Sequence, residues 1–252
     1  IEECEKQFES KIENHHLIRN RKCAIRTTTK ILELSHKYDT TVYFAHVATA
    51  DEMDLIKDAK KINDKIFCEV TPHHLLITRK VLKNVQNWGR VNPPLRDSKD
   101  NKRIYEAIID GTVDTIGTDH APHNLDEKNN DYINAPSGFP GFETCLPLLL
   151  NEVNNGNISL EIVEKITSKN ASKIFNLKNR GLIKECYFAD LVIIYLNKTY
   201  KVDPKNFQTK AKYSPFIDLE LKGDIFMTIV NGEIGFSNGT LKNTKGIELD
   251  YC

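Results

Sequence analysis

The first half of the chain alternates between helical and strand-like spacing of its apolar side chains. Residues 22–38 place Ile31, Leu34 and Tyr38 at helical intervals, and the short apolar run 41–46 follows at once. This succession predicts a helix and then a buried strand.

The same succession begins again at Thr49. Together with Glu52 it forms a capping-box pattern that opens a helix, and the apolar run 65–70 predicts a second strand behind that helix. The side chains expected along one face of the helix are Met53, Ile56 and Ile62.

A third repeat covers a helix at 98–110, with Ile104 and Ile108 facing inward, and a strand at 113–118. Gly111 supplies the stop signal between them. Alternating helices and strands imply parallel βαβ units, in an open sheet or in a (β/α)8 barrel. In both folds ligands bind at the carboxyl ends of the strands.

The pattern changes after about residue 180, where helical spacing largely disappears. Residues 188–196 and 223–236 are β-rich runs, and the second contains Asn231 and Gly232 as a hairpin signal. We therefore expect an α/β region at 1–180 and a small β domain at 181–252.

The chain has 252 residues, of which 40% are hydrophobic, enough for a substantial core. Lys plus Arg and Asp plus Glu both total 35, so the formal net charge is zero. Such a chain has no net charge to attract nucleic acid or an anionic membrane, and we expect neither partner. A small neutral or anionic substrate is compatible with this composition.

The six cysteines are scattered without CxxC pairs or regular spacing. This favours reduced thiols and a cytoplasmic location over a disulfide framework. No apolar run approaches the roughly 20 residues that cross a bilayer, and no signal-like segment is visible. The first residue is not Met, so we expect the chain to begin inside a longer protein.

Polar side chains follow each predicted strand, and Asp119 is the first candidate for chemistry. A carboxylate at the end of a buried strand is paired, bound to metal or used as a proton carrier, because desolvating it alone is costly. The alternative is a helix N-cap. His120 and His123 stand within the next four residues, and His46 ends the first strand as either a metal ligand or a structural histidine.

His73 and His74 follow the second predicted strand. Adjacent residues on a strand point to opposite faces, so we expect that these two do not chelate one ion. Two loops are rich in Pro and Gly: one presents Asn92, and the other presents backbone amides around Ser137 and Gly138. A structural turn and a surface loop are the alternatives for these segments.

No GxxxxGK[ST], GxGxxG, GxSxG or HExxH occurs, so phosphate-loop, dinucleotide and serine-hydrolase interpretations lack their motifs. Several segments together resemble dihydroorotase, in the cyclic-amidohydrolase branch of the metal-dependent amidohydrolases. They are AHVATADEMDLIKDAK, CEVTPHHLLIT, VNPPLRDSKDNKRIYEAIIDGTVDTIGTDHAPH, EK, APSGFPGFETCLPLLL and GLIKECYFADLVII.

The resemblance implies an enzyme of pyrimidine biosynthesis that interconverts N-carbamoyl-L-aspartate and dihydroorotate. It implies the carboxyl-terminal part of a (β/α)8 TIM-type barrel, one or two zinc ions and a small β-sandwich. His46 matches the zinc-ligand histidine after the sixth barrel strand. Asp119 matches the aspartate after the eighth strand, which contacts zinc and transfers the proton. The positions that match substrate contacts are Asn92, His123, Ser137 and Gly138.

The family's earlier ligands, an HxH motif above all, find no match among the eight histidines. A catalytic zinc needs about three protein ligands, so we expect the others upstream of residue 1 or on a separate chain that covers the open barrel edges. Another cyclic-amide hydrolase, such as an allantoinase or dihydropyrimidinase, and a non-catalytic scaffold are the alternatives. The sequence leaves the oligomeric state, a homo-oligomer included, open.

Overall fold

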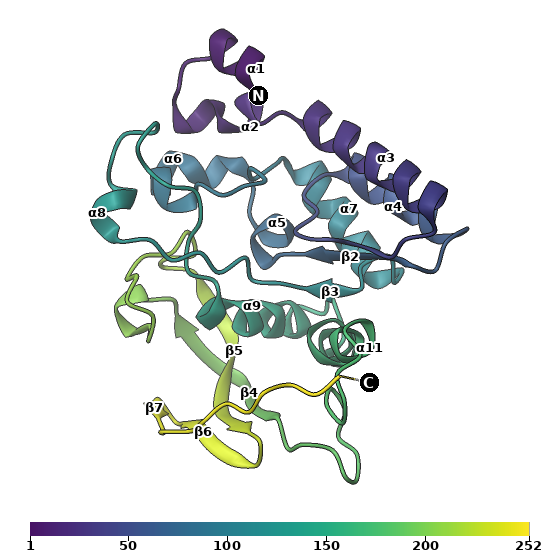
Figure 1. The fold of residues 1–252 in the computed structure, drawn as a ribbon. Helices are drawn as coiled ribbons and strands as arrows, with labels where there is room; N and C mark the ends of the chain where they lie inside the picture. Colours follow the sequence, from purple (N-terminus) through teal and green to yellow (C-terminus); the bar gives the residue numbers. More distant parts are fainter. Residues whose placement is uncertain (252) are drawn as a thin grey trace. The chain divides into compact units, whose positions relative to one another are not determined.

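The computed structural model describes residues 1–251, which form two compact units (Figure 1). The first unit comprises Ile1–Glu143 and Asp203–Ile217, and the second comprises Thr144–Val202 and Asp218–Cys252. The boundary expected at residue 180 separates an α/β region from a small β domain, and it is not defined in the same way as these compact units. This boundary stays a prediction.

The first unit contains a parallel three-stranded sheet in the order β1-β2-β3. These strands are Val42–Phe44, Ile66–Val70 and Thr115–Ile116. Val42 pairs with Ile66, and Val70 pairs with Ile116. The helices α3 (Arg21–Tyr38), α4 (Ala50–Lys60) and α7 (Ser98–Ile109) lie together beside the sheet (Figure 1). The predicted alternation of helices and parallel strands is confirmed, although the third strand is shorter than expected.

Shorter segments complete the first unit. The short helices are α1 (Glu2–Gln7), α2 (His15–Ile18), α5 (Pro72–Leu76), α6 (Leu82–Val85) and α8 (Leu125–Lys128). Single 3₁₀ turns lie at Ile12–Asn14, Arg79–Val81, Gln86–Gly89 and Pro204–Asn206.

Helix α4 begins as its sequence predicts, because the Thr49 side chain accepts a hydrogen bond from the Glu52 amide. Met53 and Ile56 are fully buried. Ile62 was expected on the same face and is instead 79% exposed. It lies beyond the helix end at Lys60, where helical spacing no longer determines its direction.

The second unit contains an antiparallel four-stranded sheet, β4-β5-β6-β7. Its strands are Leu191–Lys201, Glu220–Val230, Glu233–Ser237 and Thr240–Leu241. Asn231 and Gly232 connect β5 to β6 with φ angles of 53° and 85°, which confirms the hairpin signal. Its helical segments are α9 (Phe142–Asn154), α10 (Leu160–Glu164), a π-helical turn (Lys165–Lys169) and α11 (Asn170–Ile174), and the first two residues of α9 belong to the first unit.

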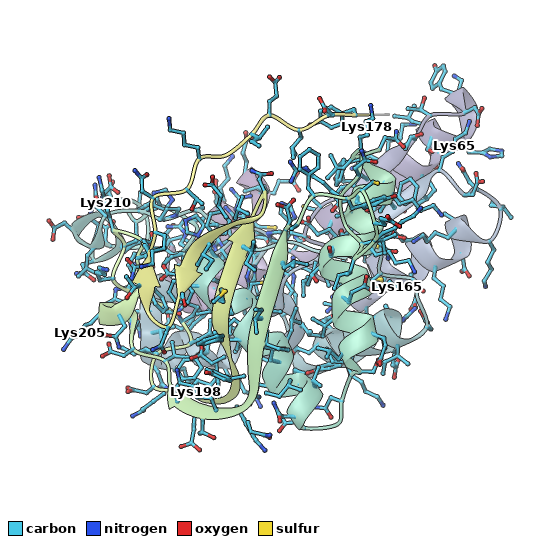
Figure 2. All side chains as sticks on the ribbon, turned by 90° about the horizontal axis from the view of Figure 1, so that it is seen from below. Lys65, Lys165, Lys178, Lys198, Lys205 and Lys210 are labelled. Carbon is cyan, nitrogen blue, oxygen red and sulfur yellow. The ribbon has the colours of Figure 1, made fainter. Side chains whose placement is uncertain are left out.

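Most lysines project toward solvent, as Lys165, Lys178 and Lys205 do in Figure 2. No helix within residues 1–251 is long and apolar enough to cross a lipid bilayer. No disulfide joins the cysteines at 4, 23, 68, 145 and 186.

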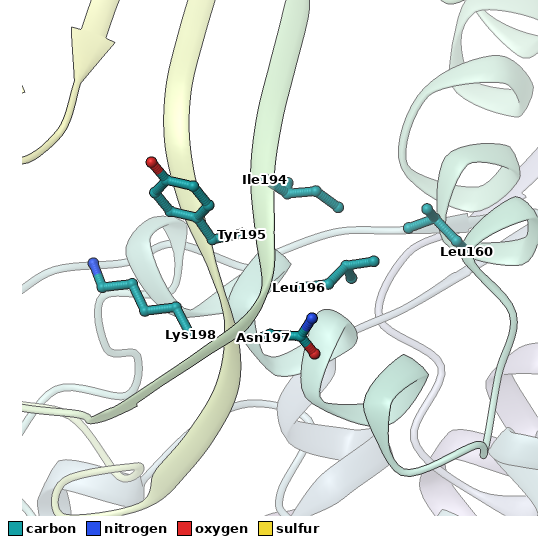
Figure 3. A pocket seen from close by; sticks show the side chains of 6 residues that line it. All are labelled: Leu160, Ile194, Tyr195, Leu196, Asn197 and Lys198. Carbon is teal, nitrogen blue, oxygen red and sulfur yellow. The ribbon is translucent and has the colours of Figure 1, made fainter.

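An open pocket of about 590 Å³ lies between β4 and α10 in the second unit. Ile194 and Leu196 point toward Leu160, whereas Tyr195 and Lys198 lie on the other side of the strand (Figure 3). Ile194 and Leu196 alternate with Tyr195 as strand side chains do, whereas the register shift between Tyr195 and Thr199 places Lys198 on the other side.

Candidate active site

Two of the predicted site residues follow strands of the first unit in an unusual backbone conformation. His46 stands two residues after β1 with φ of 41°, and Asp119 follows β3 with φ of 50°. Residues other than Gly rarely adopt a positive φ, and those that do concentrate at functional sites. The structure thus gives the same local conformation to both residues that the sequence proposed as metal ligands.

Glu69 on the central strand β2 lies among these strand ends. Its carboxylate accepts hydrogen bonds from the Tyr43 hydroxyl at 2.9 Å and from the His46 amide at 3.4 Å. A Cβ at Gly117 would overlap this carboxyl group, so a larger residue there would force the end of the Glu69 side chain to move. Glu69 therefore fixes the backbone from which His46 projects.

Burial raises the pKa of Asp119 above its usual range. The negative charge of Glu69 raises it further, whereas His46 lowers it by favouring the ionised form. Asp119 consequently lies within electrostatic reach of both residues. A half-buried carboxylate in this setting suits a group that takes up and releases a proton.

The histidine pair lies on helix α5 rather than on a strand, so the prediction of opposite strand faces was wrong. The Thr71 side chain accepts a hydrogen bond from the His74 amide, and Pro72 occupies the first turn. A threonine N-cap followed by proline starts a helix. The rings of His73 and His74 lie 4.4 Å apart.

Both nitrogens of His74 already have partners. Nδ1 accepts from the Thr71 hydroxyl at 2.8 Å, and Nε2 donates to the Pro93 carbonyl at 2.9 Å. Burial lowers the pKa of His74 to about 3, so the ring is neutral. Burial also lowers the pKa of His73 far below its usual value. His74 thus holds the loop of Asn92 and has no nitrogen left for a metal.

Asn92 and His46 line the same open groove of about 540 Å³, together with Arg96. The residues that line this groove do not include Asp119, His123 or Ser137. The predicted substrate-contacting residues therefore divide into two groups, of which one lies in the groove and one in the loops after β3.

The second group is formed by two loops that hold each other. His123 Nε2 donates to the Ser137 carbonyl at 3.1 Å, and the Ala121 amide donates to the Phe139 carbonyl at 3.2 Å. Gly138 has a φ of 119°, and a Cβ there would lie 2.6 Å from that of Ala121. The structure thus brings His123, Ser137 and Gly138 together, as expected.

Some polar groups of these loops already form hydrogen bonds within the protein and are not free to bind a ligand. The Gly138 amide already donates to the Arg90 carbonyl at 2.8 Å. His120 stacks on Phe142 with centroids 3.8 Å apart, and its Nδ1 accepts from the amides of Gly141 and Phe142. His120 therefore anchors the loop, and the Gly138 amide is engaged within the protein.

An imidazole and a carboxylate are donors that zinc accepts in proteins. Within residues 1–251, no group of three or more His, Cys, Asp or Glu side chains is placed to hold a metal ion. His46 and Asp119 fit zinc as part of a ligand set.

The sequence did not identify Glu69 or Tyr213 as contributors, and it gave Lys128 no role. Glu69 had a readable signal, a carboxylate in the apolar run 65–70. Tyr213 had none, because its hydroxyl reaches the His123 amide from a segment 90 residues away.

Comparison with known proteins identifies the family to which this chain is similar. The family model described as "Amidohydrolase family" matches residues 1–235. A dihydroorotase from Endomicrobium trichonymphae is 43% identical over 206 residues, which cover 81% of this chain and 48% of that protein. A dihydroorotase from Methanosphaera stadtmanae is 41% identical over 208 residues, with 81% and 47% covered. The chain thus spans about half the length of these curated relatives.

Solved structures agree with the family match. An L-hydantoinase (dihydropyrimidinase) from Arthrobacter aurescens superposes with a TM-score of 0.91 at 26% identity, covering 98% of this chain and 55% of that one. A D-hydantoinase (dihydropyrimidinase) from Thermus sp. has the same TM-score at 22% identity, with 97% and 55% covered, which supports the fold alone. The chain belongs to the amidohydrolase family.

Proposed function

We propose that this chain supplies the carboxyl-terminal part of a dihydroorotase, an enzyme that interconverts N-carbamoyl-L-aspartate and dihydroorotate in the cytoplasm. The observation that carries the proposal is the shared positive φ of His46 and Asp119 at the ends of parallel strands. The identity of 38–43% to several curated dihydroorotases supports this substrate over other cyclic amides.

We further propose that β1, β2 and β3 are strands of a (β/α)8 barrel. The barrel would extend to residue 180, and residues 181–252 would belong to a small β-sandwich. The parallel sheet of the first unit and the antiparallel sheet of the second support this division. The remaining strands would come from the half of the relatives' length that this chain does not span, on the same or a separate chain.

His46 and Asp119 would hold zinc, with further ligands from that other half. Zinc supplies a water whose pKa falls to near 7, so that hydroxide exists at neutral pH. One or two ions are compatible with these donors.

Asp119 would move the proton. Its carboxylate oxygen accepts a proton from the attacking water and returns it to the leaving ring nitrogen, which balances hydrolysis of the amide. The half-buried position of Asp119 after strand β3 supports this exchange. Asn92, His123, Ser137 and Gly138 would contact the substrate, with Gly138 acting through its backbone conformation because its amide is engaged.

A second candidate is hydrolysis of a different cyclic amide. The superposition on a hydantoinase (dihydropyrimidinase) favours it, because the same fold accommodates both types of ring. A non-catalytic scaffold remains the third alternative, since two ligands alone do not complete a zinc site.

The test measures hydrolysis of dihydroorotate, allantoin and dihydrouracil by the full-length protein that contains residues 1–252. We expect turnover of dihydroorotate to exceed that of the other two by at least 100-fold in kcat/KM. Preference for another ring would contradict the proposed substrate, and absence of all turnover would favour the scaffold.

Residues 1–252 by themselves should bind little zinc and show no ring closure. Metal analysis after gel filtration, with a turnover assay, checks this expectation. Stoichiometric zinc together with turnover would show that the chain needs no ligands from elsewhere.

A further inference from the structure

Lys128 differs from the exposed lysines labelled in Figure 2, such as Lys165 and Lys205. It ends the short helix α8 and is only 1% exposed. Within residues 1–251 it forms no ion pair with a carboxylate, although buried lysines are usually paired. Burial of this cation therefore needs an explanation.

The Lys128 ammonium is bonded to one loop only. Nζ donates to the Pro136 carbonyl at 2.8 Å and to the Gly138 carbonyl at 2.9 Å. These two carbonyls flank Ser137 on either side. The lysine thus holds the carbonyls of the residues before and after Ser137, whose own carbonyl receives the His123 Nε2 hydrogen bond.

Tyr213 connects this lysine to the loop of His123. Its ring lies 5.8 Å from Nζ, and its hydroxyl accepts from the His123 amide at 3.2 Å while it contacts the Gly138 carbonyl at 3.5 Å. Tyr213 is fully buried. Lys128 and Tyr213 together form a closed set of hydrogen bonds around Ser137 and His123.

The protonation state of Lys128 has little effect on its hydrogen bonds to the two carbonyls. Burial, aided by the nearby Arg90, lowers the pKa of Lys128 to about 7. The ammonium and the neutral amine both carry at least two N–H groups, enough for the two carbonyls. The geometry suits a side chain that holds a loop in place over the neutral pH range.

We propose that Lys128 is a positioning residue that sets Ser137 and His123 for contact with the ring amide. The inference rests on the proposed function, since it deepens the role of those two substrate-contacting residues. Lys128 touches no substrate itself and acts through the loop.

The first test measures hydrogen exchange in residues 1–252. The amides of Ala121 and Gly138 report on the loop, because they donate to Phe139 and Arg90. In Lys128→Met, which keeps the length and lacks donors, both amides should exchange at least 10-fold faster, while amides of α4 stay unchanged. Equal rates in the variant and the parent chain would overturn the proposal, whatever substrate the enzyme uses.

The matched control is Lys60→Met. Lys60 also donates to a backbone carbonyl, that of Thr112 at 2.8 Å, but on another loop of the first unit. Exchange at Ala121 and Gly138 should not change in this variant. If Lys128→Met does not fold, Lys128→Gln retains donors for one carbonyl and should give an intermediate increase.

The second test measures kinetics in the full-length protein. Lys128→Met should raise KM for dihydroorotate at least 10-fold while kcat falls less than threefold, and Lys128→Gln should restore part of the loss. A change confined to kcat, or an unchanged KM beside accelerated exchange, would overturn the positioning role and leave the proposed function intact. Failure of the parent enzyme to use dihydroorotate would instead contradict the proposed function, and hydrogen exchange alone would then decide on Lys128.

Discussion

The two compact units differ in how many polar side chains they bury, and most of the buried ones belong to the first unit. In the first unit, His15, His74 and Lys128 are almost completely buried, and each is bonded to a backbone carbonyl. In the second unit, the pair of Lys198 and Asp224 keeps part of its surface in water. Burying polar groups costs free energy unless their partners are well placed. The first unit therefore carries polar groups whose geometry matters.

Exposed apolar side chains occur in both units, and Ile62 and Ile133 are examples from the first. Val192, Ile193 and Tyr195 of β4 are between 44% and 47% exposed. The second unit combines the antiparallel ladder between β4 and β5 with the buried side chains of Leu148, Leu149 and Leu150 on α9. All the side chains proposed for chemistry, His46 and Asp119 among them, belong to the first unit.

The largest difference between the two units should appear in kcat when the Asp119 carboxylate is removed. Asp119→Asn keeps the shape and removes the proton acceptor, so kcat of the full-length protein should fall by about 100-fold to 10,000-fold. Asp224→Asn in the second unit is the matched control and should stay within twofold of the parent. Steady-state kinetics on dihydroorotate checks both variants, and retained turnover in Asp119→Asn would remove the proposed proton carrier.

Acid should destabilise the first unit through its buried histidines, of which His15 is one. Burial lowers the pKa of His15 to about 4, compared with 6.5 in an unfolded chain. Between these pH values the unfolded state binds more protons than the folded state. The contribution of neutral His15 to the free energy of unfolding is therefore fully present above pH 6.5 and is lost as the pH falls toward 4. The loss from His15 is about 3 kcal/mol.

Urea unfolding at a series of pH values between 7 and 4 measures this loss. His15→Gln should flatten the acid dependence, whereas His36→Gln, at an exposed position, should leave it unchanged. Identical slopes for His15→Gln and the parent chain would show that His15 titrates normally in the folded state.

A smaller effect should come from packing around Glu69. Gly117→Ala introduces a methyl group that overlaps the Glu69 carboxyl, so we expect about 1–3 kcal/mol of destabilisation. Gly246→Ala in the second unit meets nothing within 4 Å and should be nearly neutral. The urea midpoints of both variants measure the difference, and equal midpoints would mean that the strand ends are no more tightly packed than the second unit.

Much of the local structure followed from the sequence because it depends on neighbouring residues. The capping pattern at Thr49 started α4, and the Asn231 and Gly232 pair formed the predicted hairpin. The position of Asp119 directly after an apolar strand was also readable. The helix at His73 has a local signal too, because Thr71 and Pro72 before it are an N-cap and a first-turn proline.

The sequence alone thus determined the order of helices and strands, the polar residues at the strand ends and the resemblance to a family, since each depends on spacing along the chain. The tertiary structure decided what no local pattern contains. It placed Tyr213 beside His123, and it put the Lys128 ammonium between two carbonyls. Such contacts join residues whose separation in the chain carries no signal, and only packing brings them within hydrogen-bonding distance.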